Sequence, residues 1–272
     1  MKPYRLIALD IDGTLLNSKK EIPPENAQAI RQVAEQGKWV VFCTGRAVCE
    51  LKELYEALPQ VRYAVFASGG GIYDARENRA FSLRGIPRSQ AEAILALAAT
   101  KDLMPQIVTP DKDVIQRSHL AHLAHYHMEP YRSLYEKTMT LTPDIFAFAS
   151  ACPDPFLKIN LYHADPPERE RTRAQLAHLD MEKAYSEVSS LEFSAKDVNK
   201  GTGLIRLCQA LGVEKEECVA VGDAENDIPM LRAAGLGVAM GNAAAPVRAA
   251  ADKVTEDLDH GGCAGAIRLL LD

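Results

Sequence analysis

The chain alternates short, uninterrupted apolar runs with segments whose apolar residues recur at helical spacing. Helical spacing covers residues 27–34 and 204–211, and a glycine follows each segment closely. Runs free of polar residues are typical of strands in a parallel sheet that helices cover on both faces. We therefore predict an α/β fold with a doubly wound, Rossmann-like parallel sheet. The runs are Leu6–Leu9, Trp39–Cys43, Tyr63–Ala67, Cys218–Val221 and Leu236–Met240.

The middle of the chain has a different pattern. Helical spacing is seen over residues 90–100 and 169–179, but the candidate strands lie among many prolines and charges. This change predicts a separate α+β unit inserted into the first domain. We expect residues 1–83 and 194–272 to form the core and residues 84–193 to form the insertion. The candidate strands of the insertion are Ile107–Val108, Phe156–Tyr162 and Lys183–Val188.

Composition limits the classes of partner. The 272 residues are 47% hydrophobic and 25% charged, an ordinary balance for a folded protein. A formal charge of −6 argues against nucleic acid or an anionic membrane as the main partner. The six cysteines lack metal-ligand spacing, and Cys43, Cys208 and Cys218 fall in apolar patterns, which indicates buried thiols in a reducing compartment. We expect a cytoplasmic protein with no membrane association and no obligate protein partner.

Acidic residues follow two of the apolar runs. Asp10 and Asp12 come after the first run, and Asp223 and Asp227 come after the run that ends at Val221. If these runs are neighbouring parallel strands, the carboxylates converge at one edge of the sheet and require a cation, most simply Mg²⁺. A strand followed by Asp-x-Asp-Gly also suits an ordinary turn. The second acidic string makes a metal site the better interpretation, with one aspartate able to attack and another to move a proton.

Four short motifs resemble those of the haloacid dehalogenase (HAD) phosphatase superfamily. They are Asp10-x-Asp12-Gly13-Thr14-Leu15, Thr44-Gly45-Arg46, Lys200-Gly201 and Gly222-Asp223-x-x-Asn226-Asp227. Further stretches resemble the Cof-type branch of that superfamily, in which a cap domain is inserted between the second and third motifs. The resemblance therefore implies a HAD core with a substrate-specificity cap over residues 84–193. The stretches that resemble the Cof-type branch are Ser68–Asp74, Leu191–Phe193, Asp197–Gly201 and Met240–Ala243.

The resemblance implies a role for each motif residue. Asp10 would be the nucleophile that forms an aspartyl-phosphate, and Asp12 would be the general acid and base. Asp10, Asp223 and the backbone carbonyl of Asp12 would hold Mg²⁺, with Asp227 outside the ligand set as an orienting residue. The residues that would bind the phosphoryl group or the substrate are Thr44, Gly45, Arg46, Lys200 and Asn226.

Several residues keep two interpretations. Arg46 suits a substrate contact and a surface ion pair equally well, and a lysine at a helix start such as Lys200 is often a solvated side chain. His119, His122, His125 and His127 could bind a transition metal, but no carboxylate or cysteine completes a ligand set. A polar helix is the better interpretation of these histidines, whose role stays open.

The prediction is a Mg²⁺-dependent phosphatase that hydrolyses a small phosphorylated metabolite, with a sugar phosphate favoured. A phosphomutase of the same superfamily and a catalytically silent small-molecule-binding module are the alternatives. Nothing in residues 84–193 matches a specific recognition pattern. Pyridoxal phosphate, hexose phosphates and nucleotides therefore all remain candidate substrates.

Overall fold

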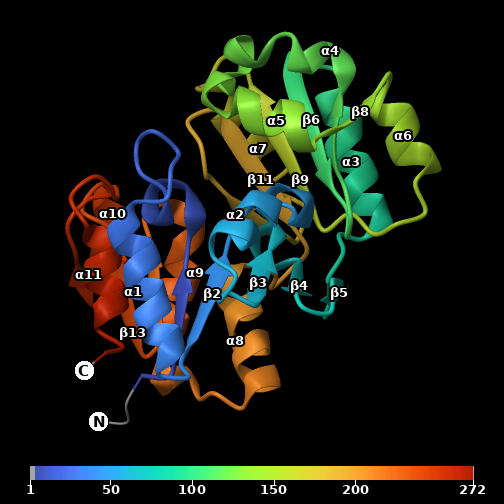
Figure 1. Cartoon of the computed structure of the whole chain (residues 1–272). Helices are drawn as coiled ribbons and strands as arrows, with labels where there is room; N and C mark the ends of the chain where they lie inside the picture. The colour runs from blue at the N-terminus through green and yellow to red at the C-terminus, as the bar shows by residue number, and fades with distance from the viewer. Residues whose placement is uncertain (1–3, 272) are drawn as a thin grey trace. The chain divides into compact units, whose positions relative to one another are not determined.

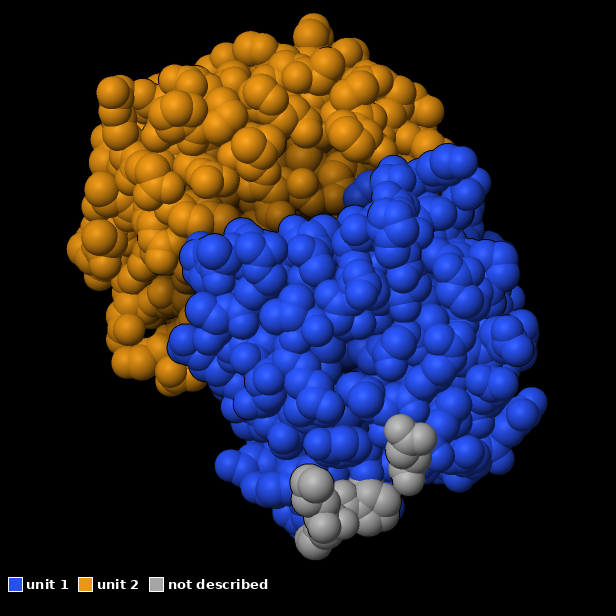
Figure 2. Space-filling model, turned by 90° about the vertical axis from the view of Figure 1, so that its left-hand side faces the viewer, with its two compact units in different colours: residues 1–45, 52–82, 199–272 blue, residues 46–51, 83–198 orange. Residues whose placement is uncertain are grey.

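The computed structural model describes residues 4–271 and divides the chain into two compact units (Figure 2). The first unit comprises residues 1–45, 52–82 and 199–272, and the second comprises residues 46–51 and 83–198. The expected insertion, residues 84–193, lies inside the second unit. The second unit also includes residues 46–51, which we expected in the core. They join the second unit through contacts with residues far away in the sequence, which a local pattern does not reveal. Within the described part of the chain, no helix is long and apolar enough to cross a membrane.

The first unit is built on an eight-stranded sheet of order β14-β13-β12-β1-β2-β3-β4-β5 (Figure 1). The strands from β14 to β3 are parallel, as predicted, whereas β4 and β5 pair antiparallel. Only residues 67–70 separate β3 from β4, which is too short for a crossover, so the chain returns antiparallel. The strands are β1 (Leu6–Leu9), β2 (Trp39–Cys43), β3 (Tyr63–Phe66), β4 (Gly71–Asp74), β5 (Arg79–Phe81), β12 (Cys218–Gly222), β13 (Leu236–Ala239) and β14 (Lys253–Val254).

Helices cover this sheet. Leu204, Met230 and Val247, from three different helices, belong to one buried cluster with Leu6 and Ala8 of the central strand. Two other helices, α1 and α11, pack against each other (Figure 1). All four residues of β1 are fully buried, as expected for the central strand of a doubly wound sheet. The helices are α1 (Pro24–Glu35), α2 (Lys52–Ala57), α8 (Lys200–Leu211), α9 (Ile228–Ala233), α10 (Ala245–Ala250) and α11 (Gly262–Arg268).

The second unit has a six-stranded sheet of order β10-β11-β9-β6-β7-β8. Neighbouring strands are antiparallel except for β7 and β8. The strands are β6 (Leu103–Val108), β7 (Asp113–Gln116), β8 (Thr140–Thr142), β9 (Lys158–His163), β10 (Glu182–Ala184) and β11 (Ser190–Ser194). The helices are α3 (Arg88–Ala98), α4 (Arg117–Leu120), α5 (Arg132–Thr138), α6 (Ile145–Ala151) and α7 (Glu168–Gln175). Mixed α+β structure is therefore present, although β10 is shorter than the strand expected over 183–188.

The predicted polar helix through the four histidines is wrong. Helix α4 ends at Leu120, and the chain continues as a 3₁₀ turn over Leu123–Tyr126. His127 then adopts a left-handed backbone with φ of 60°, which cannot continue a helix. The Nε2 atom of His125 lies 2.7 Å from Oδ2 of Asp102. Among residues 4–271, the only group of three potential ligands close enough to hold a metal lies elsewhere.

Candidate active site

Strand pairing brings Asp10 and Asp223 to the same edge of the first unit's sheet. β1 and β12 are parallel neighbours with Leu9 opposite Val221. The backbone N–H of Asp10 continues this ladder by donating to the carbonyl of Val221 at 3.0 Å. Each aspartate therefore follows the carboxyl end of its strand, where ligand sites of such sheets form.

The turn after β1 is fitted closely to Asp223. Gly13 has a φ of +84°, and a Cβ at this position would lie 2.2 Å from Oδ2 of Asp223. Thr14 donates its hydroxyl to Oδ1 of Asp223 at 2.7 Å. On the other side of the turn, the side-chain amide of Asn242 donates to the carbonyl of Gly13 at 2.9 Å. The turn thus requires glycine and holds the Asp223 carboxylate in one orientation.

Lys200 is a buried cation between two carboxylates. It begins α8, whose first turn is capped by the side chain of Asn199 accepting from the backbone N–H of Thr202. Its Nζ lies 2.6 Å from Oδ1 of Asp10 and 2.5 Å from Oδ1 of Asp227. The lysine side chain is only 2% exposed. The alternative of a solvated helix-start lysine is therefore wrong.

Asp227 has its acceptor oxygens engaged by the protein itself. Oδ1 accepts from Lys200, and Oδ2 accepts from the backbone N–H groups of Asp223 and Ala224, both at 2.9 Å. Gly222 permits this approach, because a Cβ there would lie 2.5 Å from Cβ of Asp227. Asp227 is therefore suited to orienting its neighbours rather than to binding a ligand directly.

The carboxylates destabilise one another's charge. Burial and the nearby carboxylate of Asp227 raise the pKa of Asp10 well above its usual value, against the opposing effect of Lys200. Burial and Asp227 also raise the pKa of Asp223, to about 7. Burial alone would lower the pKa of Lys200, but Asp10 and Asp227 reverse this and hold it well above its ordinary value. The cluster is an acidic site with too little positive charge.

This donor set fits a hard divalent cation. Asp10, Asp223 and Asp227 each place one carboxylate oxygen within 4.8 Å of the others. Carboxylate oxygens are the ligands that Mg²⁺ prefers. Because Lys200 and two backbone N–H groups already engage Asp227, Asp10 and Asp223 are the side chains best placed to hold the ion.

The other predicted site residues lie in loops near these strand ends or in the second unit. Asp12 lies in the turn after β1. Thr44 and Gly45 directly follow β2, where Thr44 is 1% exposed and its carbonyl accepts from the N–H of Ser68. Asn226 is buried in the 3₁₀ turn after β12. Arg46 belongs to the second unit, so the geometry of the first unit leaves its two interpretations open.

Three contacts in this region were not predicted. Lys20 places its Nζ 3.1 Å from Oδ1 of Asp12. Asn242 supports Gly13, as described above, and the Thr14 hydroxyl donates to Asp223. Asn242 does lie in one of the motifs that resemble the Cof-type branch. Its partner, however, is 229 positions away and could not be identified from local pattern.

Thr14→Val is expected to weaken Mg²⁺ binding by about ten-fold, because the variant loses the hydrogen bond that orients Asp223. Thr14→Ser keeps the hydroxyl and should bind the ion nearly as the unaltered chain does. Isothermal titration of metal-free protein with Mg²⁺ measures both. Equal affinity in the valine and serine variants would show that this bond has no part in metal binding.

Comparison with known proteins identifies the family. The family model described as haloacid dehalogenase-like hydrolase matches residues 7–267. Phosphatase YwpJ of Bacillus subtilis is 32% identical across 98% of this chain and 100% of its own length. The 5-amino-6-(5-phospho-D-ribitylamino)uracil phosphatase YcsE of the same organism is 30% identical across 97% of this chain and 94% of its own. A solved haloacid dehalogenase-like hydrolase from B. subtilis has 29% identity and a TM-score of 0.86, covering 97% of this chain and 99% of that chain. The chain therefore belongs to the haloacid dehalogenase-like hydrolase family.

Proposed function

We propose that this protein is a Mg²⁺-dependent phosphatase that hydrolyses a small phosphorylated metabolite through an aspartyl-phosphate on Asp10. The observation that carries the proposal is the buried Lys200 ammonium, within 2.6 Å of both Asp10 and Asp227. A buried lysine beside a carboxylate can hold that carboxylate ionised and oriented for attack. It can also offset the charge of an incoming phosphate.

In the proposed first step, a carboxylate oxygen of Asp10 bonds to phosphorus while the bond from phosphorus to the leaving oxygen breaks. The Asp12 carboxyl gives its proton to that leaving oxygen. In the second step Asp12 removes a proton from a water molecule, which attacks phosphorus and breaks the Asp10–phosphorus link. Inorganic phosphate leaves, and both aspartates return to their starting states.

The remaining residues bind and orient the phosphoryl group. Lys200 and Thr44 would contact its oxygens, and Asn226 would contact the group or its bound waters. Bound Mg²⁺, held by Asp10, Asp223 and the carbonyl of Asp12, would neutralise charge on the transferring group. Asp227 fixes Lys200, and Thr14 fixes Asp223, so the site is oriented before substrate arrives.

For the substrate we propose a sugar phosphate or a related compound. YcsE is named for a substrate that carries a phosphorylated ribityl chain, which is chemically a sugar alcohol phosphate. All six cysteines are free thiols, which suits our proposal of a cytoplasmic enzyme.

Phosphate release by the full-length protein tests this function. Protein treated with EDTA should release no phosphate from p-nitrophenyl phosphate, and added Mg²⁺ should restore release. No release with any divalent cation would overturn the proposal. Transfer of phosphate between sugar hydroxyls without net release would instead identify a phosphomutase.

A further inference from the structure

Two cysteine thiols touch in the core of the first unit. Cys208 lies in the last turn of α8, and Cys218 is the first residue of β12. Their Sγ atoms are 3.6 Å apart. Cys208 is 3% exposed and Cys218 is fully buried. A disulfide bond is about 2.05 Å long, so the two sulfur atoms would have to approach each other by about 1.5 Å to form one.

A third thiol packs in the same cluster but does not complete a metal site. Cys43 belongs to the buried cluster that contains Cys208 and Cys218, and its thiol donates to the backbone carbonyl of Lys200 at 3.7 Å. A metal bound by cysteines needs three or four ligand atoms around one point. Among residues 4–271, the one group of three close ligands consists of the active-site aspartates. Cys208 and Cys218 are therefore suited to bonding with each other rather than to holding an ion.

The contact makes the two thiols chemically unequal. Contact with the Cys218 thiol lowers the pKa of Cys208. The same contact, together with burial, raises the pKa of Cys218 well above its usual value. Because the thiolate is the reactive form, Cys208 is the member of the pair that attacks an oxidant first. Cys218 then keeps its proton until the second step.

The end of α8 that carries Cys208 can open toward solvent. Exposed residues, Gln209 and Ala210, follow it directly. The helix ends at Gly212, which has a left-handed backbone with φ of 62°. The turn is closed by the N–H of Val213, which donates to the carbonyl of Cys208 at 3.0 Å. Helix ends open at a much lower free energy than the whole fold, so a small oxidant has a route to the Cys208 sulfur.

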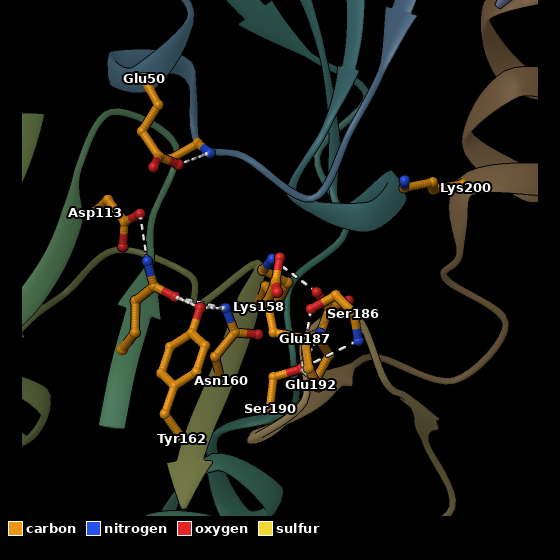
Figure 3. A network of polar contacts seen from close by, with 12 residues as sticks. Glu50, Asp113, Lys158, Asn160, Tyr162, Ser186, Glu187, Ser190, Glu192 and Lys200 are labelled. Carbon is orange, nitrogen blue, oxygen red and sulfur yellow. Dashed lines mark hydrogen bonds and ion pairs between the residues drawn. The ribbon is translucent and has the colours of Figure 1, made fainter. Parts of the chain in front are cut away.

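The opposite end of α8 is held without free space. Lys200 leaves the first turn of the helix, where it pairs with two buried carboxylates (Figure 3). A Cβ on Gly201 would lie 2.4 Å from the carbonyl oxygen of Pro229, and a Cβ on Gly203 would lie 2.4 Å from Cγ1 of Val65. The first turn therefore cannot shift sideways. Any movement that brings the two sulfur atoms together falls on the last turn.

Both thiols are remote from the active-site ends of their elements. With a rise of about 1.5 Å per residue, Cys208 lies about 12 Å along α8 from Lys200. With a rise of about 3.3 Å per residue, Cys218 lies about 16 Å along β12 from Asp223. A bond between the thiols would thus join the two elements without entering the acidic site.

We propose that Cys208 and Cys218 form a reversible intramolecular disulfide when the protein meets a peroxide, and that this bond clamps α8 to β12 without altering the active site. The Cys208 thiolate attacks a peroxide oxygen, so that an S–O bond forms, the O–O bond breaks and the departing hydroxide takes up a proton to become water. The Cys218 sulfur then attacks the Cys208 sulfur, the S–O bond breaks, and the second hydroxide leaves with the Cys218 proton as water. An external dithiol reduces the disulfide and restores both thiols.

Treatment of the full-length protein with hydrogen peroxide tests the bond. The number of thiols that react in the denatured protein should fall from six to four, and dithiothreitol should restore six. Trypsin cuts after Arg206, Lys215 and Arg232, so a digest without reductant should contain residues 207–215 joined to residues 216–232.

Three results of this experiment would overturn the proposal. One is a count that stays at six. Another is a joined peptide that contains Cys49 or Cys152, the half-buried thiols, in place of the pair. The third is sulfinic acid on Cys208 with the Cys218 thiol still free, since it would show that the second step does not occur.

The clamp should also raise the melting temperature of the peroxide-treated protein by about 5 °C, because it closes the short loop between the two cysteines. Cys208→Ser and Cys218→Ser should each lose this gain. Cys263→Ser is the matched control, since Cys263 is a buried thiol of the same unit in α11, and it should keep the gain. A gain that persists in Cys208→Ser would contradict the clamp. The joined peptide of the unaltered protein decides the question if a variant fails to fold.

Turnover shows whether the clamp leaves the active site unchanged, and this readout rests on the proposed phosphatase function. The oxidised protein should release phosphate from p-nitrophenyl phosphate within about two-fold of the rate of the reduced protein, because the bond is distant from the chemistry. A larger loss that dithiothreitol reverses would overturn the claim of an unaltered site. Inactivity in both states would overturn the proposed function, while the thiol count and the joined peptide would still decide the disulfide.

Discussion

Asp10→Asn should reduce phosphate release by about a thousand-fold or more, because an amide oxygen cannot act as the attacking carboxylate. Asparagine has nearly the same shape and can still accept from Lys200, which keeps its second partner Asp227. The variant should therefore fold and lose only chemistry. Acid-quenched single-turnover experiments should find phosphate bound to the unaltered protein and none bound to the variant.

Asp74→Asn is the matched control for this prediction. Asp74 is also a buried aspartate in the first unit, paired with Arg62 at 2.6 Å, but it lies at the end of β4. Its replacement should lower thermal stability and leave turnover within about two-fold, since it is not among the groups around Lys200. Retention of a tenth or more of the activity by Asp10→Asn would show that another group attacks phosphorus.

Lys200→Met should abolish turnover and also destabilise the metal-free protein by about 3–5 kcal/mol. The ammonium is buried between Asp10 and Asp227, and its removal leaves these carboxylates facing each other without a cation. Urea unfolding in EDTA measures the loss of stability. Added Mg²⁺ should recover part of it, because a bound divalent ion supplies the missing positive charge.

A double variant separates the two effects of Lys200. Lys200→Met combined with Asp227→Asn removes one of the opposed charges and should regain part of the stability, while activity stays absent. This non-additivity is expected of residues in one ion-pair network. An unfolding midpoint for Lys200→Met equal to that of the unaltered chain would show that the buried pairs contribute nothing net.

The convergence of Asp10, Thr44 and Asp223 could be predicted from sequence, for a local reason. Each of these three residues directly follows a strand, and parallel strands align their ends at one edge of the sheet. The buried state of Lys200 was not accessible in this way, because its partners Asp10 and Asp227 are 190 and 27 positions away. The same holds for the bonds from Thr14 to Asp223 and from Lys20 to Asp12, which depend on how the turn folds.

The second unit was harder to predict. Its strands mix apolar and polar side chains, so the pattern suggested strands but not which residues share a face. Asn160 and Gln106 are neighbours only through the register of β9 and β6. The histidines illustrate the opposite error, since their regular spacing indicated one helix where the chain turns at His122 and His127.

Gly13 shows how a residue without a functional group can restrict sequence change as strongly as a catalytic one. Any side chain at this position would enter the space of the Asp223 carboxylate, and its backbone conformation already disfavours other residues. Replacement of Gly13 by any larger residue would therefore displace the Asp223 carboxylate, although the glycine itself has no side chain that could take part in chemistry. The absence of a side chain at position 13 leaves the space that the Asp223 carboxylate occupies.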